Sequence, residues 1–162
     1  MTDDATTAPH YGEPLPVTTL ERMRILVVDD TEHMRKLLRQ FLYLIGLRNV
    51  DTFGDAASAL KALQHDDARL VITDLNMQPM NGLQLITAVR SGKNVANPAI
   101  PIVVLSGSSD LKTLKQALEA GANGILVKPV SLATLRERVL PLLPLHWPSE
   151  AKPQSASWAF PI

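Results

Sequence analysis

The feature that most constrains the fold is a set of four short apolar runs, each followed directly by residues able to do chemistry. The runs cover residues 25–28, 70–73, 102–105 and 124–127, and they are followed by Asp29 and Asp30, by Asp74, by Ser106 and by Lys128. Runs this short, bounded by polar residues, are typical of strands buried on both faces of a parallel sheet. Open parallel sheets bind their ligands at the carboxyl ends of the strands. The pattern therefore predicts that three carboxylates, a hydroxyl and an ammonium group meet at one sheet edge.

The segments between these runs have the spacing of amphipathic helices. Residues 32–45 place an apolar side chain every three or four positions, and Gly46 follows as a helix terminator. A further strand is expected over residues 49–53, and further helices over residues 56–63, 83–90, 111–120 and 132–140. The expected N-caps are Thr31, Asp55, Asp110 and Ser131. Five strands alternating with five helices predict an α/β fold, a (βα)5 doubly wound five-stranded parallel sheet.

The ends of the chain differ in composition from this central part. Residues 1–21 contain Thr, Asp and Pro without periodicity and are expected to form a flexible leader, whereas residues 22–143 form one domain. Residues 144–162 are rich in proline and are expected to be a disordered tail. The tail carries Trp147, Trp158 and Phe160, which are either anchors for a partner's groove or, in the case of Trp147, a ring that packs back on the domain.

Composition excludes several classes of protein. The 162 residues have a formal net charge of +0, so the broad basic footprint of a DNA-binding protein is missing and direct DNA binding is not expected. The chain has no cysteine and no apolar run long enough to cross a bilayer, and its N-terminus lacks the pattern of a signal peptide. We expect a cytoplasmic protein that does not insert into membranes.

Three clustered carboxylates repel one another unless a cation lies among them. Oxygen ligands at a partly open site suit Mg²⁺, which keeps several of its waters. Asp74 could then act as a nucleophile toward phosphorus, with Lys128 neutralising a phosphoryl oxygen and Ser106 donating to another. Taken singly, each of these residues is more often a helix cap, a turn serine or a solvated charge. Their occurrence together, at the ends of successive strands, favours a phosphoryl-transfer site.

The motifs Val27-Val28-Asp29-Asp30, Asp74 to Gly82, Ser106-Gly107 and Lys128-Pro129 occur in this order. With them the chain resembles, over about residues 24–142, the receiver domain of bacterial two-component response regulators, which has a flavodoxin-like fold. The resemblance implies that Asp74 accepts phosphate from the phosphohistidine of a sensor histidine kinase or a histidine phosphotransfer protein. It also implies that Asp30, Asp74 and the backbone carbonyl of Asn76 ligate Mg²⁺, with Asp29 assisting through water. Ser106 would shift toward the phosphoryl group, and Lys128 would bind it, often before a cis proline peptide.

The sequence departs from the family pattern at two positions. Ile125 stands where the family often has an aromatic residue whose ring turns inward when the hydroxyl residue moves, so the coupling of Ser106 to the surface is expected to be weaker or differently built. Gln78 stands where proline commonly follows Met77, with Pro79 one residue later. We expect the loop to keep its stiffness, because Pro79 still fixes a backbone angle.

The expected function is that of a stand-alone, chemotaxis-type response regulator, a phosphoacceptor rather than an enzyme, with possible self-dephosphorylation and no output domain. Its phosphorylated form would bind a downstream protein through residues 111–120, 124–127 and 132–140, with Lys112, Lys115, Glu119 and Arg136 lining that face. One alternative is a phosphohydrolase of haloacid-dehalogenase type, but such enzymes need an Asp where this chain has Asn76. Another is a receiver-like binding module that works without phosphorylation, which the five intact site residues disfavour.

Overall fold

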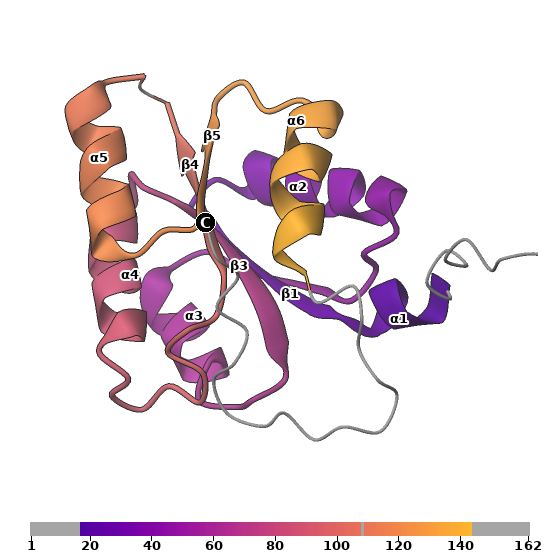
Figure 1. The fold of residues 1–162 in the computed structure, drawn as a ribbon, viewed down its shortest axis with the longest axis horizontal. Helices are drawn as coiled ribbons and strands as arrows, with labels where there is room; N and C mark the ends of the chain where they lie inside the picture. Colours follow the sequence, from indigo (N-terminus) through magenta and orange to yellow (C-terminus); the bar gives the residue numbers. More distant parts are fainter. Residues whose placement is uncertain (1–16, 108, 144–162) are drawn as a thin grey trace, which may run out of the picture.

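The computed structural model describes residues 17–107 and 109–143, and its centre is one five-stranded parallel sheet (Figure 1). The strands are β1 (Arg24–Val28), β2 (Val50–Phe53), β3 (Ala68–Asp74), β4 (Ile102–Ser106) and β5 (Gly124–Val127). They lie in the order β2-β1-β3-β4-β5, which places β3 at the centre. The predicted (βα)5 parallel architecture is confirmed.

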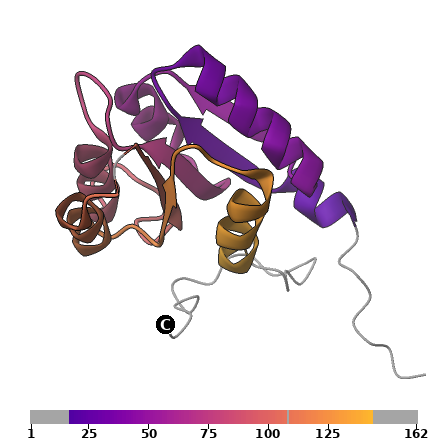
Figure 2. The same cartoon turned by 90° about the horizontal axis from the view of Figure 1, so that it is seen from above.

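Helices cover both faces of this sheet (Figure 2). They are α1 (Val17–Arg22), α2 (Glu32–Ile45), α3 (Ala56–Ala62), α4 (Gly82–Arg90), α5 (Leu111–Ala120) and α6 (Leu132–Val139), with a 3₁₀ turn at Leu140–Leu142. Alternate residues of β1 enter two separate cores: Leu26 and Val28 pack on the side of α3, α4 and α5, whereas Ile25 and Val27 pack on the side of α2 and α6. Both faces of β1 are therefore apolar, as the sequence pattern predicts.

The register of the strands brings their carboxyl ends together. Val28, the last residue of β1, pairs with Thr73 of β3, and Asp74 pairs with Leu105 of β4. Ser106 then pairs with Val127, the last residue of β5. The residues that follow these strands consequently lie along one edge of the sheet.

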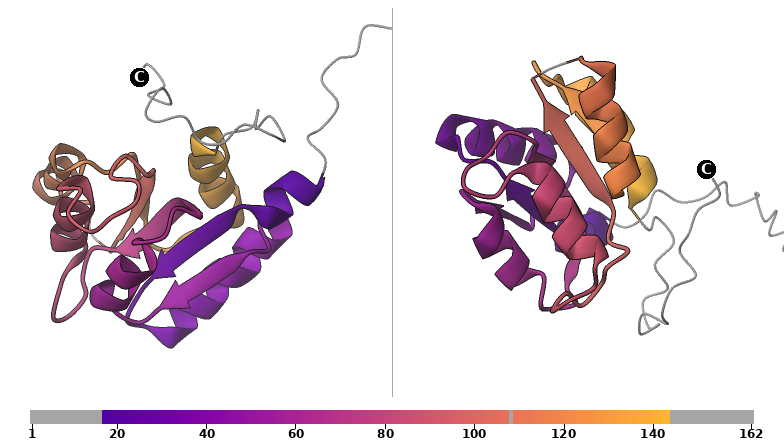
Figure 3. Two further views of the ribbon diagram at one scale, coloured as in Figure 1. Left: turned by 90° about the horizontal axis from the view of Figure 1, so that it is seen from below. Right: turned by 90° about the vertical axis from the view of Figure 1, so that its left-hand side faces the viewer.

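The leader prediction was wrong at its C-terminal end, where residues Val17–Arg22 form helix α1 (Figure 3). Tertiary contacts hold this short helix. Leu20 packs on the core under α2, and Glu21 pairs with Arg48 at 2.7 Å. Asn49 Nδ2 also donates to the carbonyl of Arg22 at 3.2 Å. Residues 1–16 and the tail, including Trp147, lie outside the described residues.

Most of the expected helix ends are confirmed. Gly46 ends α2 in the left-handed conformation at φ 105°, and the side chains of Asp55, Asp110 and Ser131 cap α3, α5 and α6. Thr31 occupies the N-cap of α2, but its side chain makes no capping hydrogen bond, contrary to the prediction. Asn81 caps α4 in a reciprocal capping box with Gln84, which the sequence analysis did not identify.

No helix in residues 17–107 and 109–143 is long and apolar enough to cross a membrane.

Candidate phosphoacceptor site

The carboxylates of Asp29, Asp30 and Asp74 meet at the carboxyl ends of β1 and β3. One oxygen from each lies within 4.8 Å of the others. Asp29 is completely buried and Asp74 is 4% exposed, whereas Asp30 lies on the surface. Since β1 and β3 are neighbours in the sheet, this clustering follows directly from the strand register.

Asp29 is held firmly in the protein, yet one of its oxygens accepts no hydrogen bond from the part of the chain that the structure describes. Its Oδ1 accepts from the backbone N–H of Thr31 at 2.8 Å, and its carbonyl accepts from the Arg35 guanidinium at 2.7 Å. Its Oδ2 is buried and accepts no hydrogen bond from the described residues. Burial raises the pKa of the Asp29 carboxyl, and the charge of Asp74 adds to the rise, against the bond from Thr31. A buried carboxylate oxygen that accepts no hydrogen bond is a suitable ligand for a cation.

Lys128 supplies a cation at this sheet edge. Its Nζ lies 3.3 Å from Oδ2 of Asp74 and 3.9 Å from Oδ2 of Asp29. Its backbone N–H donates to the carbonyl of Ser106 at 2.8 Å, which fixes Lys128 to the end of β4. The Lys128–Pro129 peptide is cis, as the resemblance implied. The lysine side chain is 27% exposed, so its ammonium group stays in reach of solvent.

The backbone on either side of Asp74 is closely fixed. The hydroxyl of Thr73 donates to the Asp74 carbonyl at 3.0 Å, and the N–H of Asn76 donates to Oδ1 of Asp74 at 3.3 Å. Gly82 packs so tightly here that a Cβ would collide with the carbonyl oxygen of Asp74 and lie 2.8 Å from Cα of Leu75. Gly82 lies just before the helix expected over residues 83–90, and the structure makes it the first residue of α4.

The loop from Leu75 to Asn81 combines buried and exposed positions. Leu75 and Met77 are buried and belong to the core on the α3–α5 side, whereas Asn76 between them is exposed. The Gln78–Pro79 peptide is cis. Asn76 thus lies two residues beyond the Asp74 carboxylate, at the solvent-facing rim of the cluster.

Ser106 is the last residue of β4 and is 1% exposed. It follows Leu105, which pairs with Asp74, so Ser106 lies one strand away from the cluster at the same sheet edge. On the other side of β4, Ile125 of β5 is half-buried against the core that includes α5. All of the residues predicted from strand ends therefore belong to one edge.

The donor set fits a hard divalent cation. Three carboxylates lie within 4.8 Å of one another, and two of them, those of Asp29 and Asp74, lie within 4 Å of the Lys128 ammonium. The buried Oδ2 of Asp29 accepts no hydrogen bond from the described residues. All candidate ligands are oxygens, which Mg²⁺ prefers over nitrogen or sulfur. The residues present thus offer the oxygen ligands that Mg²⁺ requires.

Comparison with known proteins identifies the family. The model of the response regulator receiver domain matches residues 25–140, and the chain belongs to this family. The chain is 32% identical over 119 residues to the chemotaxis protein CheY-3 of Vibrio cholerae, covering 74% of this chain and 90% of that protein.

Solved structures have the same fold. The structure of Vibrio cholerae CheY4 superimposes with a TM-score of 0.68 at 29% identity, covering 75% of this chain and 98% of that one. The receiver domain of a sensor histidine kinase from Pseudomonas aeruginosa, solved with magnesium in its active-site cleft, gives a TM-score of 0.63 at 22% identity. That match covers 71% of this chain and 92% of that domain. The chain is a CheY-like receiver domain of two-component signal transduction, and such domains are signalling phosphoacceptors rather than conventional enzymes.

Proposed function

We propose that Asp74 is the phosphoacceptor of this receiver and that Asp29, Asp30, Asp74 and the backbone carbonyl of Asn76 hold the Mg²⁺ on which the reaction depends. The observation that carries the proposal is the ion pair between Asp74 and Lys128, beside the buried Oδ2 of Asp29, which accepts no hydrogen bond from the described residues. The pair places a nucleophilic carboxylate and a phosphate-binding cation 3.3 Å apart at the sheet edge where open α/β proteins bind ligands.

The proposed reaction transfers a phosphoryl group from a phosphohistidine of a sensor histidine kinase or a histidine phosphotransfer protein in the cytoplasm. A carboxylate oxygen of Asp74 forms a bond to phosphorus while the P–N bond of the donor breaks, and the released imidazole takes up a proton. Bound Mg²⁺ would supply positive charge for the phosphoryl oxygens. Lys128 pairs with a phosphoryl oxygen in place of the Asp74 carboxylate, and the Ser106 hydroxyl donates to another.

Asp74 suits the role of nucleophile better than the two other carboxylates. It ends the central strand, its carbonyl accepts a hydrogen bond from Thr73 Oγ1, and its side-chain Oδ1 accepts one from the N–H of Asn76. Asp29 is completely buried, so a phosphoryl donor has less access to its carboxylate. Asp30 is exposed, so its carboxylate is less firmly positioned. Positioning supplies much of the rate in such transfers, because the bond-forming atoms must lie in line.

The signal is proposed to leave the site through α5, β5 and α6, where it changes affinity for a downstream protein by roughly tenfold to a hundredfold. Lys112, Lys115 and Glu119 are exposed on α5, which supports a protein-binding role for this helix. Arg136 does not share that surface, because it faces α2. Amide shifts on adding beryllofluoride and Mg²⁺ should concentrate on α5 and β5, and shifts confined to α2 would contradict this route.

The phosphoacceptor proposal is tested by incubating the protein with acetyl phosphate and Mg²⁺ and measuring its intact mass. One added phosphoryl group is expected, and EDTA should abolish the addition. An Asp74→Asn variant should fold and gain no mass, because an amide is a poor nucleophile. Full modification of that variant, or of the parent protein in EDTA, would contradict the proposal. Loss of the added mass over time would measure the self-dephosphorylation that we also propose.

A further inference from the structure

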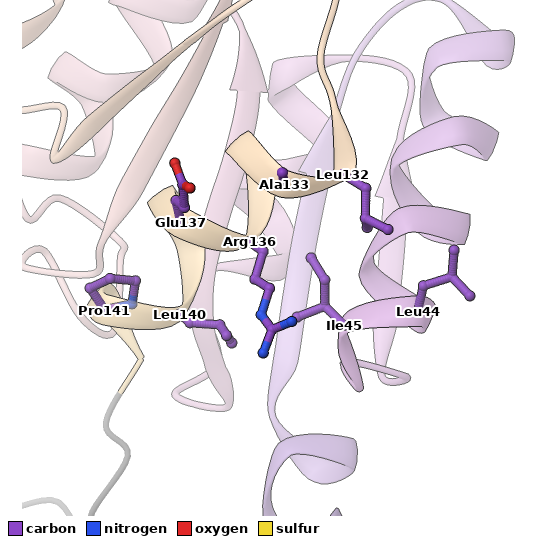
Figure 4. Close-up of a pocket in the computed structure, with 8 residues that line it drawn as sticks. All are labelled: Leu44, Ile45, Leu132, Ala133, Arg136, Glu137, Leu140 and Pro141. Carbon is purple, nitrogen blue, oxygen red and sulfur yellow. The ribbon is translucent and has the colours of Figure 1, made fainter.

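A second feature of the surface lies away from the carboxylate cluster. A groove of about 710 Å³ opens between the C-terminal part of α2 and the length of α6 (Figure 4). Leu44 and Ile45 of α2 form one wall, and Leu132, Arg136 and Leu140 form the other, with Pro141 at one end. Its volume falls within the range of about 300–1,000 Å³ that is typical of ligand-binding pockets.

The groove is mainly apolar and remains open to water. The side chains of Leu44 and Leu132 are 63% and 38% exposed, although both are large aliphatic residues. Arg136 extends across the opening toward Ile45 and provides a planar cation at the rim (Figure 4). An apolar wall beside a guanidinium is a suitable environment for an aromatic ring, because the ring buries apolar area and its face attracts the cation.

The chain itself supplies such a ring close to the groove. The described chain ends at Leu143, which is buried at 1% exposure, two residues after Pro141 of the groove. Leu145-His146-Trp147-Pro148 follows directly. Trp147 is four residues beyond Leu143, so the chain lets its backbone lie no more than about 14 Å from that fixed point. A tether this short gives the indole an effective concentration on the order of millimolar at the groove.

We propose that residues 145–148 bind in the groove between α2 and α6, with the Trp147 indole against Leu44 and Leu132 and beneath the Arg136 guanidinium. The short tether favours Trp147 over Trp158, which is fifteen residues from Leu143, and favours the chain's own segment over a second copy. This contact does not depend on the phosphoacceptor role of Asp74. The groove is thus a binding site for a segment of the same chain, on the side of the sheet that α2 and α6 cover.

Tryptophan fluorescence isolates this contact, because the chain contains only two tryptophans, Trp147 and Trp158. In the full-length Trp158→Phe variant all tryptophan emission comes from Trp147. We expect this emission to be blue-shifted from that of the unfolded chain and to resist quenching by acrylamide. Adding Leu44→Glu should shift it to the red and increase quenching, because a carboxylate would be desolvated under the ring. Adding Leu118→Glu is the matched control, since Leu118 is 52% exposed on α5 outside the groove, and it should leave the emission unchanged.

Circular dichroism would verify that each variant folds, and Leu132→Glu is the second groove variant if Leu44→Glu does not. Emission of Trp147 like that of the unfolded chain in the parent protein would overturn the proposal. So would equal red shifts from Leu44→Glu and Leu118→Glu, or no shift from either groove variant. A blue shift that disappears on dilution would overturn it in favour of a second copy as the occupant.

Discussion

Lys128 Nζ lies 3.3 Å from Oδ2 of Asp74, although Asp74 ends β3, Lys128 follows β5, and β4 lies between these strands. The ammonium therefore reaches over the end of β4 to the carboxylate of the central strand. It also approaches the buried Oδ2 of Asp29 at 3.9 Å, so one cation serves two carboxylates. Among the described residues these are the ion pairs that Lys128 forms. They hold the ammonium beside the Asp74 carboxylate, where it could contact a phosphoryl group bound to that carboxylate.

Replacing this lysine tests its role in phosphoryl transfer. Lys128→Met should slow labelling by acetyl phosphate on the order of a hundredfold, as removal of a single preorganised donor does in other transfer reactions. Lys128→Arg keeps the charge and should recover part of the rate. The measurement is the rate of mass gain at saturating Mg²⁺. A Lys128→Met rate equal to that of the parent would remove Lys128 from the site.

The metal site is tested by a pair of aspartates that differ in their surroundings. Asp30→Ala should weaken Mg²⁺ binding more than about tenfold, since even residues outside the ligand shell contribute ten- to hundredfold to metal affinity. Asp110→Ala is the control, because Asp110 caps α5 by accepting from Lys112 and Thr113. That variant should lose about 1 kcal/mol of stability and no Mg²⁺ affinity. Titration calorimetry giving equal losses would mean that the metal site lies elsewhere.

Gly82 is predicted to be intolerant of any side chain. Gly82→Ala should lower the free energy of unfolding by about 1–3 kcal/mol, because the new methyl group meets the backbone of Asp74 and Leu75 and no rotamer relieves it. The gain in helix propensity is about 1 kcal/mol, so the collision outweighs it. Phosphorylation should slow as well, since the Asp74 carbonyl must move. Gly107→Ala is the control for urea unfolding, because a Cβ there meets nothing within 4 Å. Equal stabilities of the two variants would show that the packing at Gly82 is loose.

The cap of α3 gives stability a defined pH dependence. The backbone N–H of Ser58 donates to Oδ1 of Asp55 at 2.8 Å, and this bond, aided by the Ser58 hydroxyl, lowers the pKa of Asp55 from its usual 3.8. A lowered pKa in the folded state stabilises the protein above pH 3.8, and the contribution is lost as pH falls through the folded pKa. Asp55→Ala should therefore be less stable than the parent at pH 7, with a gap that closes in acid. Asp55→Asn caps at every pH and should retain most of the stability at pH 7. A gap between Asp55→Ala and the parent that is independent of pH would contradict the assignment.

The strand ends were predictable because a buried parallel strand appears in the sequence as a short apolar run. Open α/β sheets bind ligands at the carboxyl ends of such strands, so the residues at the end of each run are candidate site residues. The surroundings of Asp29 were not predictable, because they depend on how Thr31 and Arg35 are positioned in three dimensions. Among the described residues, no hydrogen bond reaches its Oδ2. The prediction that the Thr31 side chain caps α2 was wrong for a related reason. The Thr31 N–H donates to Asp29, and the threonine side chain makes no bond to the helix.

Helix α1 was missed because its sequence, with Val17 and two threonines, has little intrinsic helix propensity. Contacts of Leu20 and Glu21 with parts of the chain more than twenty residues away stabilise it. The capping box of Asn81 and Gln84 had a local signal, an Asn followed three residues later by Gln, that was available in the sequence. Local signals are thus readable in advance, whereas elements held by distant contacts are not.

The central claim is that the phosphoryl group is carried by Asp74, and reductive trapping tests it most directly. Borohydride reduces an acyl phosphate to an alcohol, which leaves a permanent mass change on the modified aspartate. After treatment with acetyl phosphate and Mg²⁺, then borohydride, peptide sequencing by mass spectrometry should find the reduced residue at position 74. Samples prepared with EDTA should contain none. Reduction at Asp29 or Asp30 in place of Asp74, or no reduction in a protein that has gained the phosphoryl mass, would contradict the account.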